Sequence, residues 1–265
     1  MNQSQSATRR GHEAIIQAFK DRAHTVRFIP FVMGGDPTLQ ATEKHVWDLA
    51  RLGATVIEIG VPYSDPLADG PVIQEAALRA LHSGTTVRRL FDLVARMRAN
   101  GLTIPIVLLV YVNTVLRYGI DSFFKSARDS GVDGLIIPDL PWEEMAPFRQ
   151  SETLTGVSII PLVTLTSVER LPEVLKDRLG FVYVVSSLGV TGTREALDDR
   201  LVSFLQEVRT YTDLPVAVGF GISHQNHIDA LAGHADAVII GSHLIAHLAA
   251  GRTVDDWYHS LFKTT

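Results

Sequence analysis

The chain lacks cysteine altogether and contains little lysine. Without cysteine it can form no disulfide bond, no thiolate nucleophile and no cysteine-ligated zinc site. Its five lysines all lie in predicted helical or terminal stretches, away from the ends of the predicted strands. A Schiff-base aldolase or a pyridoxal enzyme needs a buried lysine at a strand end. Both classes are therefore disfavoured, and no bound cofactor is expected.

Long hydrophobic runs and basic clusters are also missing. The longest apolar run, Ile104–Val112, is half the length that a membrane-spanning helix requires, and Met1–Arg10 is polar, unlike a signal peptide. The net charge is −5, and no basic stretch is denser than single arginine pairs. We therefore expect a cytoplasmic protein that binds neither membranes nor nucleic acids, with residues 1–10 flexible.

What the chain does contain is a regular series of short apolar segments. Hydrophobic residues make up 46% of its 265 residues, and most segments are almost continuously apolar, as parallel strands covered on both faces are. Eight such segments alternate with helical patterns and no linker divides them. This predicts one (β/α)8 TIM-barrel domain over residues 1–265, with an open doubly wound sheet as the alternative. The predicted strands are Arg27–Val32, Val56–Gly60, Ile106–Val110, Gly134–Pro138, Ser158–Val163, Phe181–Val185, Val216–Gly219 and Ala237–Ile240.

The segments between the strands have helical spacing of apolar residues. One runs from a cap at Thr85 or Thr86 to Asn100, and another ends at Gly131. His12–Phe19 predicts an extra helix before the first strand. The connections after the second and sixth strands are longer than the others, and barrel active sites are built from the loops that follow the strands. We therefore expect the chemistry in these two enlarged loops.

Glu58 lies near the end of the second predicted strand. Strand alternation places it on the same face as Val56 and Gly60, while Ile57 and Ile59 share the other face. An acid at this end of a barrel strand points into the mouth, where partial loss of water raises its pKa towards the range of a proton shuttle. A buried structural acid paired with arginine is the other interpretation.

A stiff loop with two acids, Asp65 and Asp69, follows Glu58. Its sequence, Pro62 to Pro71, contains three prolines and a glycine. Aspartate before proline or glycine often closes a turn, which favours a turn role for Asp65. Asp69 is the better candidate for catalysis, because the loop is long, rigid and adjacent to Glu58.

Glycines at the ends of three later strands predict a phosphate site. They lie in Leu188–Gly192, in Gly219-Phe220-Gly221 and in Gly241-Ser242. Glycine allows close approach of the backbone, and N–H groups at a helix start bind anions. The pattern for dinucleotides and the Gly-Lys-Ser/Thr loop are both absent. His243 and His247 have metal-ligand spacing, but no nearby acid completes a site, so no metal is expected.

The run from Glu58 to Gln74 closely resembles the signature of the tryptophan synthase alpha subunit family. Shorter motifs support the likeness in the same order, from about Phe28 to Leu248. They are Gly35-Asp36-Pro37, Tyr111-Val112-Asn113, Pro138-Asp139-Leu140-Pro141, Gly189-Val190-Thr191-Gly192, Gly219-Phe220-Gly221-Ile222 and Gly241-Ser242. Two positions depart from the family pattern: Met33 stands where threonine is usual, and Ser187-Leu188 stands where a more polar or basic pair is frequent.

The resemblance implies retro-aldol cleavage of indole-3-glycerol phosphate to indole and glyceraldehyde 3-phosphate. In the family, the acid that matches Glu58 shuttles protons, and the acid that matches Asp69 accepts the indole N–H. The resemblance also implies a beta subunit partner in an alpha2beta2 heterotetramer. We expect it to dock at the barrel mouth over Asn113 and over the stiff loop, where Pro62, Ser64, Asp65 and Pro66 should be exposed. The implied substrate-binding residues are Phe31, Leu109, Tyr183, Thr191, Gly192, Phe220, Gly221, Gly241 and Ser242.

Two other functions share these residues. A stand-alone lyase would release free indole, and a regulatory subunit without catalysis would only activate a pyridoxal-dependent partner. The presence of both Glu58 and Asp69 counts against the second.

Overall fold

The computed structural model describes residues 10–20, 27–186, 199–219 and 221–262. Its strands are all parallel, and each pairs with the next around the sheet in the order β5-β4-β3-β2-β1-β9-β8-β7-β6. The strands are β1 (Arg27–Met33), β2 (Ile57–Gly60), β3 (Ile106–Leu109), β4 (Gly134–Ile136), β5 (Ser158–Ile159), β6 (Leu162–Thr164), β7 (Val182–Val185), β8 (Val216–Gly219) and β9 (Ala237–Ile240).

The two ends of this sheet, β5 and β6, belong to one predicted strand. The prediction of a continuous strand over Ser158–Val163 is wrong, because Pro161 has no N–H for the ladder. The N–H of Ile160 donates to the Leu135 carbonyl at 2.8 Å, and the N–H of Tyr183 donates to the Pro161 carbonyl at 2.9 Å. Backbone pairing therefore passes from β4 to β7 at this point, which closes an eight-stranded barrel with its fifth strand interrupted.

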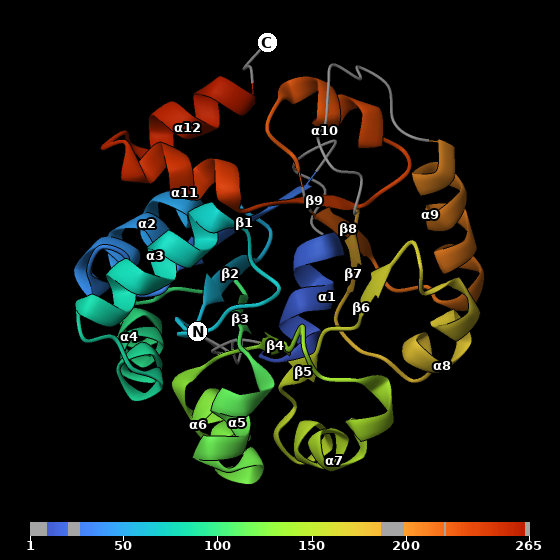
Figure 1. The fold of residues 1–265 in the computed structure, drawn as a ribbon, viewed down its shortest axis with the longest axis horizontal. Helices are drawn as coiled ribbons and strands as arrows, with labels where there is room; N and C mark the ends of the chain where they lie inside the picture. The colour runs from blue at the N-terminus through green and yellow to red at the C-terminus, as the bar shows by residue number, and fades with distance from the viewer. Residues whose placement is uncertain (1–9, 21–26, 187–198, 220, 263–265) are drawn as a thin grey trace, which may run out of the picture.

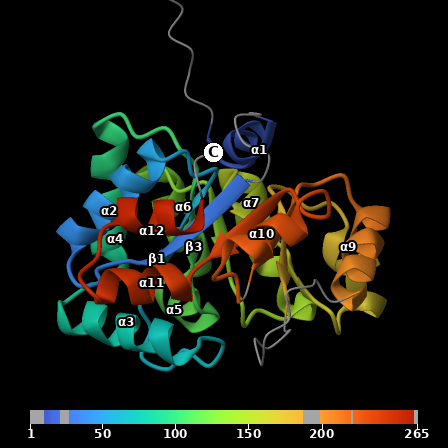
Figure 2. The same cartoon turned by 90° about the horizontal axis from the view of Figure 1, so that it is seen from above.

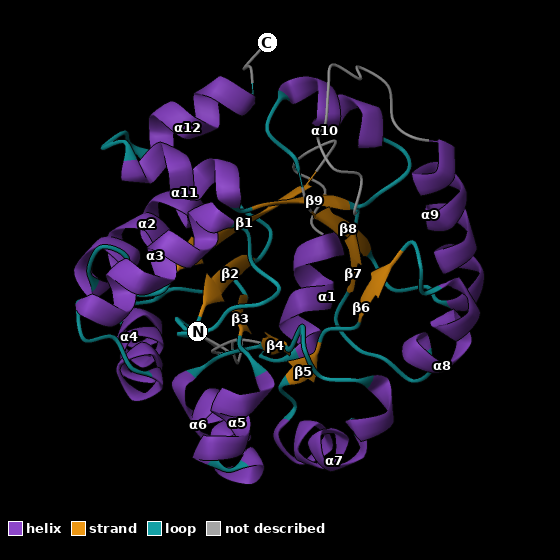
Figure 3. Cartoon of the chain, viewed as in Figure 1, coloured by secondary structure: helices purple, strands orange, loops and turns teal. Residues whose placement is uncertain are grey.

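Helices surround the ring of strands, as Figures 1 and 3 show. The segments predicted after Thr86 and before Gly131 are α4 and α6, with Thr86 and Gly131 as their caps. The helices are α1 (His12–Lys20), α2 (Leu39–Arg51), α3 (Pro71–His82), α4 (Val87–Ala99), α5 (Val112–Tyr118), α6 (Ile120–Ser130), η1 (Trp142–Glu144), α7 (Ala146–Thr155), η2 (Val168–Arg170), α8 (Leu171–Leu175), α9 (Asp199–Tyr211), α10 (Gln225–Leu231), α11 (Ser242–Ala249) and α12 (Val254–Leu261). In the described part of the chain, none is long and apolar enough to cross a membrane.

Strand alternation divides the buried residues into an inner and an outer core. Ile29, Val107 and Ile239 belong to a cluster inside the barrel. Ile57 and Leu108 belong to the larger cluster between the strands and the surrounding helices. Because both faces are buried, the strands are continuously apolar in sequence, as predicted.

Helix α1 covers the amino-terminal end of the barrel. Its residues Ile15 and Phe19 join the inner core, and the rings of Phe19 and Phe181 lie 5.6 Å apart. Just before the helix, the N–H of Gly11 donates to the buried Asp133 carboxylate at 2.8 Å. In Figure 2, α1 lies at the opposite end of the barrel from α3. Helix α1 thus packs against the inner core at one end of the barrel, and the carboxyl ends of the strands lie at the other end.

Candidate active site

A cavity of about 380 Å³ opens among the carboxyl ends of the strands, a volume that suits a small-molecule ligand. Its wall is formed by β1, β2, β3, β7 and β9, by the loop of residues 61–70, and by the starts of α3 and α11. Eight of the residues predicted from the sequence line it: Phe31, Glu58, Asp69, Leu109, Tyr183, Gly221, Gly241 and Ser242.

Glu58 lies in the wall of this cavity with its side chain almost fully withdrawn from water. It is 1% exposed, and β2 places it between Phe31 of β1 and Val107 of β3. Among the residues that the structure describes, its Oε2 atom has no hydrogen-bond partner and no cation contributes to its pKa. The alternative of a structural acid paired with arginine is therefore unsupported. Burial, with a smaller contribution from the nearby Asp69, raises the pKa of Glu58 to about 8. At neutral pH the group is a carboxylic acid that can donate a proton.

Asp69 comes from the loop after β2 and lies close enough to Glu58 for the two carboxyl groups to interact. Burial raises the pKa of Asp69, and a hydrogen bond from the Tyr111 hydroxyl opposes that change. Its backbone is held as well, because its carbonyl accepts from Gln74 Nε2 at 2.8 Å. Glu58 is thus a strongly buried acid, and the Tyr111 hydrogen bond partly stabilises the ionised form of the neighbouring Asp69.

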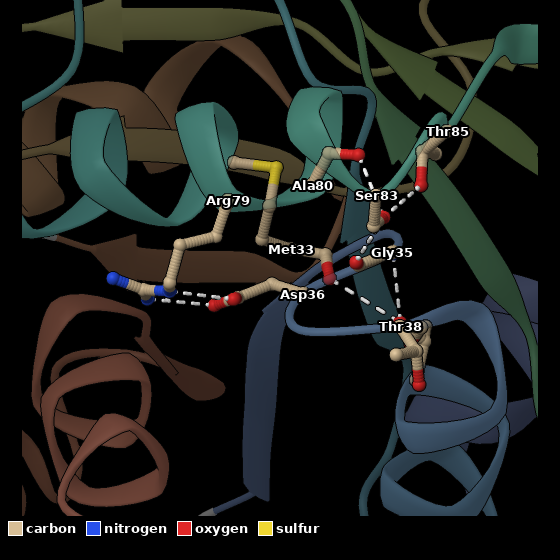
Figure 4. Close-up of polar contacts among 9 residues, drawn as sticks. Met33, Gly35, Asp36, Thr38, Arg79, Ala80, Ser83 and Thr85 are labelled. Atoms are coloured by element: carbon tan, nitrogen blue, oxygen red, sulfur yellow. Dashed lines mark hydrogen bonds and ion pairs between the residues drawn. The ribbon is translucent and has the colours of Figure 1, made fainter.

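A polar network fixes α3, the helix that follows Asp69. Arg79 of α3 donates two hydrogen bonds, at 2.7 and 2.8 Å, to the carboxylate of Asp36 in the loop after β1 (Figure 4). Ser83 donates to the carbonyl of Gly35 at 3.1 Å and contacts the hydroxyl of Thr85. A side chain at Gly35 would collide with Thr85, so the tight approach requires glycine there. These contacts join the loop after β1 to α3 and to the segment between α3 and α4.

Tyr111 contacts Asp69 from behind the cavity wall, and no role was predicted for it. Its hydroxyl donates to Asp69 Oδ2 at 3.1 Å and accepts the N–H of Ala68 at 3.1 Å. Its ring stacks on Tyr63, with 5.1 Å between ring centroids, and Asn113 donates to the Tyr63 hydroxyl at 3.1 Å. The motif containing Tyr111 and Asn113 marked the segment, but nothing in its spacing indicated contact with Asp69.

The remaining wall is mostly apolar and was only partly predicted. Ile239 of β9 and Ile73 of α3 line the cavity beside Phe31 and Leu109. Strand alternation places Ile239 inside the barrel and could have indicated it, whereas Ile73 depends on how α3 packs. Further lining residues without a predicted role are Ala68, Gly70, Pro71, Val72 and Ile222.

Tyr183 of β7 also lines the cavity, where burial and the neighbouring Glu58 and Asp69 raise its pKa well above the ordinary tyrosine value. Its hydroxyl therefore stays protonated. A Cβ atom at Gly219 on the adjacent strand would lie only 2.6 Å from this hydroxyl. The absence of a side chain at Gly219 is thus what makes room for Tyr183.

One end of the cavity has the features of an anion site. Gly221 follows β8 with a φ of +80°, a conformation that favours glycine. Gly241 and Ser242 form the start of α11, whose first N–H groups have no partner within the helix. Three other residues predicted to bind substrate, Thr191, Gly192 and Phe220, lie outside the described residues.

The histidine pair on α11 packs towards the interior and towards α12. His243 Nδ1 accepts a hydrogen bond from Trp257 Nε1 at 3.1 Å, and His247 is buried. Across the described ranges, no group of three potential metal ligands is present.

The residues predicted to face a partner lie in the loop after β2 and at the start of α5. Ser64, Asp65 and Asn113 are exposed, and the Ser64 hydroxyl donates to the Asp65 carboxylate at 2.8 Å. The expectation that Pro62 is exposed is wrong: it is buried, because the preceding residue continues the pairing of β2 with β3. Pro66 is half-buried.

Comparisons with known proteins agree over most of the chain. The sequence profile described as "Tryptophan synthase alpha chain" matches residues 17–259. The tryptophan synthase alpha chain of Halalkalibacterium halodurans is 47% identical over 218 residues, which is 82% of each chain. That of Alkaliphilus metalliredigens is 44% identical over 236 residues, 89% of this chain and 88% of the relative.

Solved structures give the same result. The tryptophan synthase subunit alpha from Campylobacter jejuni matches with a TM-score of 0.81 and 31% identity, covering 91% of this chain and 96% of that one. A chain of the tryptophan synthase complex from Pyrococcus furiosus matches with a TM-score of 0.80 and 31% identity, covering 89% and 97%. By sequence and by structure, the chain belongs to the tryptophan synthase alpha chain family.

Proposed function

We propose that the chain cleaves indole-3-glycerol phosphate to indole and glyceraldehyde 3-phosphate by a retro-aldol reaction. The observation that carries this proposal is the pair Glu58 and Asp69 in one mostly apolar cavity, where burial raises the pKa of Glu58 to about 8. An apolar wall suits an indole ring, and an acid with a raised pKa suits protonation of a carbon atom. No lysine in the described part of the chain lines the cavity, so an imine through such a side chain is unsupported.

In the first step, Glu58 donates its proton to C3 of the indole ring. The ring then carries a positive charge that is shared with N1, and the carboxylate of Asp69 accepts the hydrogen bond from N1–H. Fixed charge of opposite sign, placed where charge develops, lowers the barrier most effectively in a site that excludes water. Burial of Glu58 and the partial burial of Asp69 support these roles.

In the second step, the Glu58 carboxylate removes the proton from the hydroxyl group next to the ring. The bond between this carbon and C3 of the indole breaks, and its electron pair restores the aromatic ring. The products are indole and an aldehyde, and Glu58 is again protonated. One carboxyl group thus gives and recovers a single proton, and the substrate itself accepts the electrons.

The phosphate group is proposed to bind at Gly221, Gly241 and Ser242, where backbone N–H groups at the start of α11 are available.

Glycerol phosphate is expected to raise the melting temperature with increasing concentration, because a ligand of the folded state stabilises it by RT ln(1 + [L]/Kd). Gly221→Leu should abolish the shift by filling the approach. Equal stabilisation by unphosphorylated indole glycerol, measured in the same scan, would contradict the anion site. Thr191, Gly192 and Phe220 remain proposed binding residues.

We further propose an alpha2beta2 heterotetramer in which a beta chain docks over Ser64, Asp65, Pro66 and Asn113. Asp65 is exposed and can face a basic residue of the partner, and the neighbouring Leu67 is 95% exposed. Pro62 stiffens the same loop from a buried position. Indole is apolar, so direct transfer to the next active site prevents its loss.

Asp65→Ala is expected to weaken activation by a beta chain while leaving the activity of the isolated chain unchanged. The measurement is the rate of indole formation as beta chain is titrated into each variant. If the titration curves of wild type and variant coincide, docking does not use this side chain.

The proposed reaction is tested by incubating the purified chain with indole-3-glycerol phosphate, alone and with a tryptophan synthase beta chain. Indole and glyceraldehyde 3-phosphate should form in equal amounts, faster with the partner. Equal rates in both arms would favour the stand-alone lyase. No indole from either arm would contradict the proposal and leave the regulatory subunit.

A further inference from the structure

Tyr111 occupies a junction between the catalytic loop and the rigid barrel. It is 3% exposed and lies directly between β3 and α5. On one side, the N–H of Val110 donates to the Ile136 carbonyl at 2.9 Å; on the other, the N–H of Val112 donates to the Asp139 carboxylate at 2.8 Å. Both neighbours of Tyr111 in the chain are thus hydrogen-bonded, one to β4 and one to the residues that follow β4.

The tyrosine ring is held as firmly as its backbone. Tyr63 stacks on it with 21° between the ring planes, and Asn113 fixes Tyr63 through its hydroxyl. A phenol group in this position has little rotational freedom, so its hydroxyl oxygen is a fixed point near the cavity.

The hydroxyl holds two neighbouring groups of the loop at once. It accepts the N–H of Ala68 and donates to Asp69 Oδ2, both at 3.1 Å. Accepting one bond while donating the other fixes the orientation of the O–H towards the carboxylate. Asp69 thereby receives the Tyr111 hydrogen bond at Oδ2, and its side chain also lines the cavity, where a ligand can approach it.

We propose that Tyr111 is a positioning residue for the reaction, which fixes the carboxylate of Asp69 towards the indole N–H. The inference rests on the proposed function, because it assigns Tyr111 a role in the same site. Tyr111 is not part of the cavity wall and acts through Asp69. It performs two tasks: it restricts the carboxylate to one orientation, and it favours the ionised form.

The second task gives a pH dependence with a defined sign. Burial raises the pKa of Asp69, and the Tyr111 hydrogen bond opposes this. In the described part of the chain, the other titratable groups that interact with Asp69 are Glu58 of β2 and Tyr183 of β7, while Asp139 acts on Tyr111. Asp69 must be ionised to stabilise the charged ring. Loss of the tyrosine hydroxyl therefore moves the acidic limb of kcat/KM to higher pH.

Tyr111→Phe is the direct test. We expect kcat to fall about 10-fold with KM little changed, and the acidic limb to rise by about one pH unit, the effect of one hydrogen bond to a charged group. Tyr118→Phe is the matched control, because it also removes one partly buried phenol contact, here with Ser126, from a residue that does not line the cavity. An unchanged acidic limb in Tyr111→Phe would overturn the proposal.

The same substitution in an Asp69→Asn background separates positioning from general stability. If Tyr111 acts through Asp69, Tyr111→Phe lowers the rate no further in this background. An equal loss in both backgrounds would show a structural role and overturn the proposal.

Replacing Tyr111 with 3-fluorotyrosine keeps the ring and makes the hydroxyl a stronger hydrogen-bond donor. The acidic limb of kcat/KM should therefore move to lower pH, opposite to its movement in Tyr111→Phe.

The pKa of Asp69 can also be followed without turnover by carbon-13 NMR, with the Asp69 signal assigned by its loss in Asp69→Asn. This pKa should shift in the same directions as the acidic limb. This readout separates the two proposals. A wild-type chain without lyase activity contradicts the function, whereas an unmoved Asp69 titration contradicts the role of Tyr111.

Discussion

Glu58→Gln is expected to lower kcat for indole release by roughly 10²–10⁴, because the amide keeps the shape of the side chain but can neither donate nor recover the proton. The loss should appear with little change in KM, since Glu58 moves a proton rather than anchoring the substrate. Steady-state assays with indole-3-glycerol phosphate measure both quantities. Turnover near that of wild type would contradict the role of Glu58.

The same variant should be more stable than wild type, and increasingly so with rising pH. The folded state raises the pKa of Glu58 from 4.5 to about 8, so the wild-type chain loses stability as pH rises through that interval, when the unfolded state releases a proton that the folded state retains. Glutamine does not ionise and avoids this loss. Melting temperatures at pH 5, 7 and 9, chosen to span the interval, test it.

A matched control for Glu58 is Glu152→Gln. Glu152 is also buried, and its carboxylate accepts the N–H of Ile159 at 2.6 Å, outside the cavity. An amide oxygen can accept the same bond, so activity should be retained. A rate loss as large as that of Glu58→Gln would show that burying any amide in this barrel impairs turnover.

Asp69→Asn is expected to lower kcat by about 10²–10³, in line with the removal of one preorganised charge-stabilising group. The amide oxygen still accepts the indole N–H, so binding changes less than the rate. The acidic limb of the pH profile should disappear, because the group that titrates there is gone. Measuring kcat/KM from acidic to neutral pH tests this.

Glu75→Gln provides the control for Asp69, because it removes an exposed carboxylate from α3, the helix that follows the catalytic loop. Its rate and pH profile should match those of wild type. If Asp69→Asn retains its acidic limb, another group titrates there, and Asp69 is not the carboxylate that faces the indole nitrogen.

Much of the barrel could be predicted because each strand is covered on both faces. Seven of the eight predicted strands agree with single strands of the structure to within one or two residues. The fifth fails at Pro161, where hydrophobicity continues but a backbone donor is missing. The pattern of apolar residues shows which residues are buried, but it does not show which backbone groups can form hydrogen bonds. Only the presence of proline at position 161 indicated that the strand is interrupted.

A site residue could be predicted where a side chain suited to catalysis lies at an inward-facing position of a strand or directly after it. Glu58 faces inward by simple strand periodicity, and Asp69 follows in a stiff loop. Tyr111 could not be derived in this way, because its contact with Asp69 joins residues 42 positions apart through a loop without periodicity. Ile73 likewise depends on the angle at which α3 packs, which the ion pair of Arg79 and Asp36 fixes.

The proposed reaction requires that Glu58 enters it as a neutral acid. Infrared difference spectroscopy of wild type against Glu58→Gln, titrated from pH 5 to pH 10, observes this group directly. We predict a protonated carboxyl band that belongs to Glu58 at neutral pH and disappears with a midpoint near 8. A Glu58 carboxylate already fully formed at the low-pH end of the titration would contradict the account.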